Sequence, residues 1–296
     1  MGSHVIERKR LIYPDIINEC HITKTCNSVV DGGDEHSYID IISNVFFDLA
    51  NANEILYRVR HQNNVNNKDT NSSDQYLVFQ QDMGACSRHT GGIIWETAYL
   101  LLEYLLERHR SSAPKQLRLG RTCELGAGVG FLGQCLVAEH CSCMPDLMLT
   151  ETADVVTNLR TNMTRNQSAL ENNNDCTLSV LALDWTCYKD DIKKATETIK
   201  PHSFDTLLST DVIFSTLLVE PLLETAAYLS HDQTIWYLCV QIRCAAAHQL
   251  FMDLTTSYGF YAEDISDECY RSMSNCAWGE TLDCFLFRIK RISNVE

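Results

Sequence analysis

The fold of this chain is decided by the stretch Thr122–Gly133, TCELGAGVGFLG. A short apolar strand runs into a glycine-dense turn, and the apolar start of a helix follows. Glycines this close together let a backbone pass very near a ligand, and their N–H groups can meet it at a helix N-terminus. The stretch therefore predicts a binding site for a nucleotide-type cofactor.

Segments of strand and helix character alternate around this stretch. A first helix is expected over the apolar run 93–106. Strands are expected at Arg121–Leu125, Leu147–Thr150, Leu178–Leu183, Thr206–Ser209, Ile235–Gln241 and Leu282–Ile289, and helices at Phe131–Glu139, Ala153–Asn162, Leu217–Tyr228 and Cys244–Ser257. Such alternation predicts an α/β fold, a parallel sheet with helices on both faces. Ligands of such sheets bind beyond the carboxyl ends of the strands.

The first part of the chain differs in character from this alternating part. We expect residues 1–89 to form a partly ordered N-terminal extension and residues 90–296 to form the cofactor-binding domain. Apolar and β-branched stretches within 37–60 predict strands or a short helix. The segment 62–74 is rich in Asn, Ser and Asp and predicts a solvated loop.

Composition excludes several classes of function. The formal net charge of −15 disfavours nucleic acid as a partner, because nucleic-acid binders usually carry basic patches. The sequence has no apolar run of membrane-spanning length and no secretory segment at its start, so the 14 cysteines are expected as reduced thiols. We expect a monomer of the cytoplasm, with a nuclear location also compatible. The cluster His140–Cys143 lacks a second ligand pair, so no metal site is predicted.

The glycine turn by itself leaves the cofactor open. The spacing of Gly128, Gly130 and Gly133 also satisfies the dinucleotide-binding pattern, with Glu151 at the distance of a ribose-binding acid. Glu124 argues for a different cofactor, because a carboxylate before the turn suits a cationic sulfonium compound and repels a pyrophosphate. Its alternative role is to cap the turn, and the alternative role of Glu151 is to cap the helix after it.

Two further strand ends carry polar groups. Asp184 and Trp185 end the third strand and offer a carboxylate for an exocyclic amine and an aromatic surface for a purine. Asp211 ends the fourth strand in the run STDVIF, at 209–214, which puts another carboxylate over the middle of the expected cleft. Trp95, like Trp185, also has an alternative role as an ordinary core residue.

Taken together, these motifs resemble the family 16 protein lysine methyltransferases. The resemblance covers about residues 90–292 and rests on Trp95 before a helix, ELGAGVG at 124–130, an acid after the second strand, LDW at 183–185 and DVIF at 211–214. Members are S-adenosylmethionine-dependent enzymes. The resemblance implies a Rossmann-like, seven-stranded class I methyltransferase sheet, with the extension added at its N-terminus.

The resemblance also implies roles for the candidate residues. The cofactor-binding residues would be Trp95, Glu124, Gly126, Ala127, Gly128, Glu151, Asp184, Trp185 and Thr210. Glu124 would lie near the ammonium group of the cofactor, and Glu151 would accept hydrogen bonds from the ribose hydroxyls. The three residues after Leu125 would lie along the methionine part and ribose, and Asp184 would flank the adenine.

The substrate side of the implied site centres on Asp211 and Phe214. Asp211 begins the family's Asp-x-x-Tyr motif, and Phe214 stands where tyrosine is usual, so the aromatic wall is kept and the hydroxyl is lost. Asp211 is expected to orient the target lysine rather than to act as a general base. The implied substrate is a single lysine of a protein such as a translation factor or chaperone, with specificity from residues 1–89 and 264–281.

Three other functions stay open at this stage. One is methylation of another acceptor, such as arginine or a small molecule. Transfer to the amino group of a nucleic-acid base is disfavoured, because Val212 and Ile213 occupy the proline positions of the motif that those enzymes carry. The second is a non-catalytic binding module that keeps the fold, which the change at Phe214 leaves open. The third is a dinucleotide-dependent oxidoreductase.

Overall fold

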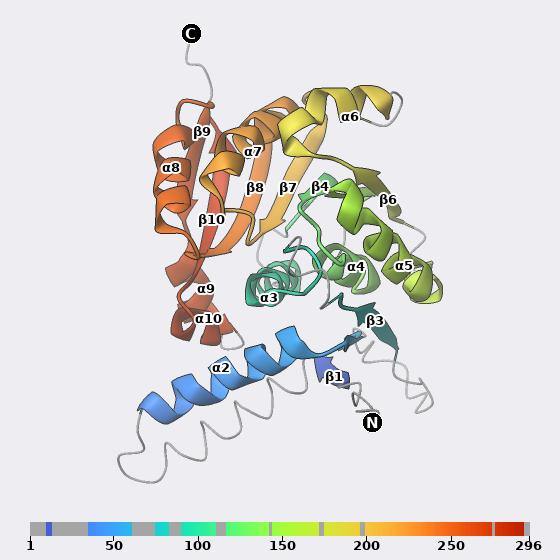
Figure 1. The fold of residues 1–296 in the computed structure, drawn as a ribbon, viewed down its shortest axis with the longest axis vertical. Helices are drawn as coiled ribbons and strands as arrows, with labels where there is room; N and C mark the ends of the chain where they lie inside the picture. Colours follow the sequence, from blue (N-terminus) through green and yellow to red (C-terminus); the bar gives the residue numbers. More distant parts are fainter. Residues whose placement is uncertain are drawn as a thin grey trace, which may run out of the picture.

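The computed structural model describes residues 10–13, 35–60, 75–82, 90–110, 117–141, 144–171, 175–195, 199–273 and 276–292. The expected solvated loop at 62–74 lies outside these residues. Seven strands form one sheet in the order β6-β5-β4-β7-β8-β10-β9 (Figure 1). The strands are β4 (Arg121–Leu125), β5 (Asp146–Glu151), β6 (Thr177–Ala182), β7 (Phe204–Thr210), β8 (Ser230–Gln241), β9 (Phe260–Asp264) and β10 (Cys284–Arg291).

Five of these strands, β6 to β8 in the spatial order, are parallel, and β10 pairs antiparallel with both β8 and β9. The predicted seven-stranded α/β fold is therefore confirmed. The expected strands and helices are all present, with ends that differ by up to eight residues, the largest difference being at the end of α5. The strand β9 was not predicted, because its sequence FYAED carries two carboxylates and lies at the sheet edge.

Helices cover both faces of the sheet. One face carries α3 (Glu96–Arg110), α4 (Phe131–Ala138) and α5 (Ala153–Leu170), and the other carries α6 (Tyr188–Lys194), α7 (Thr216–Leu229) and α8 (Ala245–Thr255). Inner strands supply side chains to both layers. In β5, Leu147 and Leu149 join the core on the α4 side and Met148 joins the core on the α7 side. Burial on both faces explains why these strands read as continuous apolar runs.

The N-terminal extension forms a second sheet, with the order β1-β2-β3. Its elements are β1 (Arg10–Tyr13), α2 (Glu35–Asn51), β2 (Glu54–Arg58) and β3 (Tyr76–Gln80). In Figure 1 these lie below the large sheet, and α2 runs beside α10 (Trp278–Thr281), next to α9 (Ser266–Ser272). Segment 264–281, where no structure was predicted, thus contains two short helices.

The small sheet shares one hydrophobic core with the large domain. Phe131 lies at its centre, with ring centroids 6.1 Å from Tyr13, 5.9 Å from Tyr57, 5.2 Å from Phe79 and 4.6 Å from Tyr99. Because Phe131 is the first residue of α4, the extension packs directly against the helix that follows the glycine turn. Residues 10–13, 46–59 and 77–79 therefore stabilise the cofactor-binding part of the fold.

Polar contacts fix the same interface. The Arg60 guanidinium donates to both carboxylate oxygens of Glu103 on α3, one of them at 2.7 Å, and Tyr13 donates to that carboxylate at 2.8 Å. Tyr57 donates a 2.6 Å hydrogen bond to Glu139, just after α4. Glu103 and Glu139, the two buried carboxylates of this interface, thus each have an arginine or tyrosine partner, as buried charges require.

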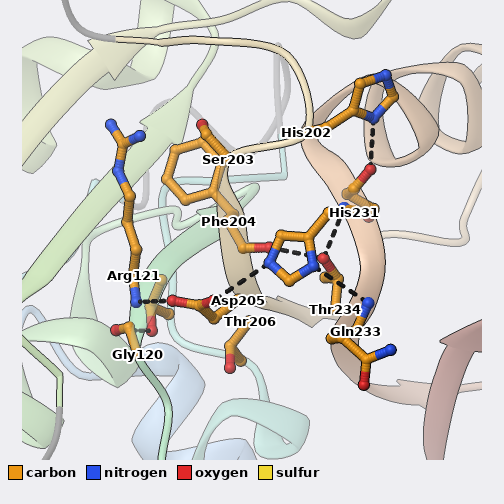
Figure 2. Close-up of polar contacts among 12 residues, drawn as sticks. Gly120, Arg121, His202, Ser203, Phe204, Asp205, Thr206, His231, Gln233 and Thr234 are labelled. Atoms are coloured by element: carbon orange, nitrogen blue, oxygen red, sulfur yellow. Dashed lines mark hydrogen bonds and ion pairs between the residues drawn. The ribbon is translucent and has the colours of Figure 1, made fainter.

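Side-chain contacts join the amino ends of the neighbouring strands β4 and β7, as Figure 2 shows. Asp205 accepts hydrogen bonds from the Arg121 N–H at 2.7 Å and from His231 Nε2 at 3.1 Å. His231 Nδ1 accepts from the Gln233 N–H at 3.1 Å, which places the ring proton on Nε2. Gly120, beside Arg121, has a φ of +61°, and a Cβ there would lie 2.4 Å from the Asp205 carboxylate. Side-chain contacts therefore join the amino ends of β4, β7 and β8.

Candidate active site

A cavity of about 440 Å³ opens at the carboxyl ends of the parallel strands. Its position is the switch point of the sheet, where the chain passes from β6 to β7 on the other side of β4. All eleven predicted site residues line it: Trp95, Glu124, Gly126, Ala127, Gly128, Glu151, Asp184, Trp185, Thr210, Asp211 and Phe214. The volume lies within the range of small-molecule and cofactor sites.

The glycine turn gives the cavity a floor of bare backbone. A Cβ at Gly126 would lie 2.9 Å from Val212 and 3.4 Å from the Trp185 ring, so this position has room only for glycine. The N–H groups of Gly126 and Ala127 both donate to the Thr150 carbonyl, at 3.1 and 2.9 Å. The expectation that the N–H groups of this turn bind the ligand is therefore wrong for these residues. Instead, the absence of side chains at the glycines of this turn leaves space for a ligand to lie close to the backbone.

Two carboxylates hold the ends of this turn. Glu124 is 1% exposed and accepts a 3.1 Å hydrogen bond from the Gly133 N–H in the first turn of α4. Burial raises the pKa of Glu124 to about 8, although the bond from Gly133 opposes the shift. Glu151 accepts 3.0 and 2.8 Å hydrogen bonds from the Gly128 and Thr152 N–H groups. Both acids therefore accept hydrogen bonds from backbone N–H groups, and both line the cavity.

The third strand end supplies one face of the cavity. Asp184 caps the short 3₁₀ turn Trp185–Cys187, accepting hydrogen bonds from the Thr186 N–H at 2.9 Å and the Thr186 hydroxyl at 2.7 Å. This turn directs the half-buried Trp185 ring toward Gly126. An aromatic ring and a carboxylate from this strand end therefore both line the cavity.

Asp211 lies directly after β7 in a backbone conformation that is rare for a residue with a side chain, with φ +55°. Its carboxylate accepts a 3.0 Å hydrogen bond from the Gln241 N–H on Oδ1 and a 2.8 Å bond from Arg243 Nε on Oδ2. Burial raises the pKa of Asp211, and Arg243 opposes this shift. Both oxygens are engaged, so Asp211 is poorly placed to take a proton from a substrate.

Arg243 is the main residue that the sequence analysis missed. Its guanidinium also donates to Glu96 at 2.8 Å and lies 4.3 Å from the centre of the Trp95 ring. Its position in the sequence could have identified it, because Arg243 follows β8 by two residues, at the carboxyl ends of the strands where ligands bind.

The charge of the cavity distinguishes between the cofactors. Among the described residues that line it are four acidic side chains, those of Glu124, Glu151, Asp184 and Asp211, and no Lys, Arg or His. Burial favours the protonated form of Glu124 until a cationic ligand binds, and Arg243, outside the lining, pairs with Asp211. Such a lining favours a ligand with positive charge and repels a pyrophosphate. The residues therefore fit S-adenosylmethionine, which carries a sulfonium and an ammonium group, better than a dinucleotide.

A comparison with protein-family models matches residues 71–257 to the lysine methyltransferase family 16. The match spans well over half of the chain. The chain belongs to this family. Membership and the class I methyltransferase fold together imply that this methyltransferase uses S-adenosylmethionine.

Solved methyltransferase structures resemble this methyltransferase at low identity. Examples are a precorrin-6y C5,15-methyltransferase from Geobacter metallireducens (13% identity, 55% of this chain and 72% of that one, TM-score 0.37), a predicted O-methyltransferase from Agrobacterium tumefaciens (16%, 67% and 81%, 0.43) and a TehB-like SAM-dependent methyltransferase from Corynebacterium glutamicum (11%, 70% and 91%, 0.39). At such values the likeness says nothing about substrate. No curated protein sequence matches the chain significantly.

Two further features were sought among the described residues, a metal-binding cluster and a membrane-spanning helix. No group of three or more His, Cys, Asp or Glu side chains is placed to hold a metal ion within the described ranges. Cys143, part of the cluster considered above, lies outside them. None of the helices that the structure describes is both long and apolar enough to cross a membrane.

Proposed function

We propose that this protein transfers a methyl group from S-adenosylmethionine to the side-chain amine of a lysine in a protein substrate. The single observation that carries the proposal is the cavity lining, which combines four acidic side chains with the apolar side chains of Phe214 and Leu218. The acids suit the cationic cofactor. The apolar side chains suit the long aliphatic stem of lysine, whose charged end alone needs polar surroundings.

S-adenosylmethionine supplies an activated methyl group on a sulfonium centre, so the protein needs little acid–base machinery. The lysine amine must lose its proton to solvent water before it attacks, and its ordinary pKa is about 10.4. The apolar wall around Phe214 and Leu218 favours the neutral amine by excluding water. Since both oxygens of Asp211 already accept hydrogen bonds, Asp211 shapes the backbone of 211–214 instead of receiving that proton.

The experiment starts with calorimetry of the purified protein against S-adenosylmethionine and, separately, a reduced nicotinamide dinucleotide. The protein is then added with tritium-labelled S-adenosylmethionine to lysate from cells that lack it. We expect binding of S-adenosylmethionine alone, and a labelled protein band whose label mass spectrometry assigns to methyl-lysine. Mapping methyl-lysine sites in those cells would identify the substrate.

The other outcomes each support a different function. Binding without any labelled band supports a non-catalytic module, and label on arginine or on a small molecule supports a different acceptor. Binding of the nicotinamide compound alone supports an oxidoreductase. As a control for specific labelling, Asp211→Asn should bind the cofactor and label the band at least tenfold more slowly, because the neutral side chain loses its ion pair with Arg243.

A further inference from the structure

Arg243 connects two parts of the cavity wall that come from distant segments. Its Nε and Nη2 lie 2.8 and 2.7 Å from Asp211 Oδ2, and its guanidinium lies over the face of Trp95. Trp95 and Asp211 line the cavity, whereas Arg243 does not. We propose that Arg243 is a positioning residue, which holds Asp211 and Trp95 in the arrangement that methyl transfer requires. The inference rests on the proposed function.

The first step of the argument is the geometry of the guanidinium. Its planar fork can accept a ring on its face while its edge donates to carboxylates, which the ammonium of lysine cannot do. Here the edge donates to both Asp211 and Glu96, and the face covers Trp95. The three partners lie on two segments that are distant in the chain: Asp211 follows β7, and the consecutive residues Trp95 and Glu96 lie at the start of α3. Arg243 therefore contacts Asp211, Glu96 and Trp95 at the same time.

The second step is the burial of this cluster. The Asp211 side chain is 4% exposed and the Glu96 side chain 15%, whereas that of Arg243 is 30% exposed. Without the guanidinium, two carboxylates would face one another in a poorly hydrated place with no counter-charge. Removing one partner from a buried pair costs much more than an exposed pair contributes. The cluster should then rearrange rather than persist.

The third step concerns what Arg243 holds. Asp211 has a strained backbone, with φ +55°, and strain of this kind persists only where surrounding contacts impose it. The chain continues from Asp211 to Phe214, so the position of the Asp211 carboxylate fixes the start of the substrate wall. The Trp95 indole is held from its edge as well, by a 3.1 Å hydrogen bond from Nε1 to the Thr90 carbonyl. Arg243 thus restrains both walls.

The test compares Arg243→Lys with a matched control, Arg121→Lys. Arg121 also pairs with a carboxylate, that of Asp146 at 2.8 Å, and lies 4.6 Å from an aromatic ring centre, that of Phe204. Its side chain is 27% exposed, close to the value for Arg243. Arg121 is the first residue of β4, shown in Figure 2, whereas the cavity lies at the carboxyl ends of the parallel strands. Loss of an arginine as such should affect both variants alike.

The rate of labelling in lysate is measured at saturating S-adenosylmethionine, together with the KM for S-adenosylmethionine. We expect Arg243→Lys to lower the rate at least tenfold, because a misplacement of about 1 Å can cost a hundredfold, and to change the KM less than threefold. We expect Arg121→Lys to retain the wild-type rate within twofold. Equal rates for the two variants would overturn the inference.

A second readout needs no turnover. The fluorescence emission spectrum of Trp95 is obtained by subtracting, for each protein, the spectrum of the same protein carrying Trp95→Phe. We expect Arg243→Lys to shift this difference spectrum and Arg121→Lys to leave it unchanged. An unchanged spectrum in Arg243→Lys contradicts the inference even if the enzyme is active. A wild-type protein that labels nothing contradicts the proposed function, and the positioning role with it, while the spectrum still reports on the contact.

Discussion

The carboxylate of Glu124 accepts a 3.1 Å hydrogen bond from the Gly133 N–H, and both groups lie inside the protein, beneath the glycine turn. This bond is too weak to offset burial, which raises the pKa of Glu124 to about 8. At neutral pH the ligand-free protein therefore holds this carboxyl mainly in its protonated form. Two predictions depend on that proton.

The first prediction is that binding of S-adenosylmethionine releases protons. An ammonium group near Glu124 favours the carboxylate and lowers its pKa, so at pH 7 up to about one proton leaves per bound cofactor. Calorimetry in two buffers with different enthalpies of ionisation measures this number. The variant Glu124→Gln should release none and bind roughly tenfold more weakly. Equal proton release by Glu124→Gln would show that another group supplies the proton.

The second prediction concerns stability without the cofactor. The folded-state pKa of Glu124 exceeds its ordinary value of 4.5, so the native state keeps a proton that the unfolded state has lost. The contribution of Glu124 to the free energy of unfolding is therefore greatest below about pH 4.5 and declines as the pH rises to about 8. Urea unfolding at pH 6 and pH 8.5 should show a larger decline for wild type than for Glu124→Gln. Parallel declines would exclude Glu124 as the source.

The third prediction concerns the aromatic wall at Phe214. The variant Phe214→Tyr keeps the ring and adds the hydroxyl that the family pattern has, so we expect a labelling rate equal to or above that of wild type. The variant Phe214→Ala removes the ring that excludes water from the amine and should lower the rate at least tenfold. Thermal melting provides the control for folding. If Phe214→Ala labels as fast as wild type, Phe214 is not part of the substrate site.

The fourth prediction compares two glycines with left-handed backbones. A Cβ at Gly120 would lie 2.4 Å from Asp205 Oδ2, whereas a Cβ at Gly259 would lie 3.3 Å from the flexible end of Arg291. Both Gly→Ala variants incur backbone strain of about 1–2 kcal/mol, and only Gly120→Ala adds overpacking of about 1–3 kcal/mol. Urea unfolding should rank Gly120→Ala as the less stable. The reverse order would contradict the close packing shown in Figure 2.

The fifth prediction tests whether the extension is part of the fold. Leu49 on α2 is fully buried in the shared core, and Phe47 on the same helix is 67% exposed. We expect Leu49→Ala to lower the free energy of unfolding by about 2–5 kcal/mol in one cooperative transition. The control Phe47→Ala should change it by less than about 0.5 kcal/mol. A second, separate transition in Leu49→Ala would mean that the extension unfolds independently.

Much of the fold followed from local pattern. The strand β4 was predicted with the same limits that the structure has, because a buried parallel strand between a polar residue and a glycine turn has unambiguous ends. The helix α5 continues to Leu170, eight residues beyond the expected end at Asn162. Asn162 and Asn166 are poor helix formers, but their side chains accept 2.9 and 2.7 Å hydrogen bonds from β3 of the extension. Tertiary contacts outweighed local propensity there.

The sequence by itself determined the family, the parallel sheet and the strand ends at which the cavity forms. These properties depend on periodicity and on glycines and acids at fixed spacings, which act within a few residues. Only the tertiary structure decided that the extension packs against Phe131 and that Arg243 joins Asp211 to Trp95. Arg243 and Trp95 are far apart in the chain, and no local preference records which charge will meet which ring. That choice is made when the ends of β7 and β8 and the start of α3 are brought together by the packing of the sheet.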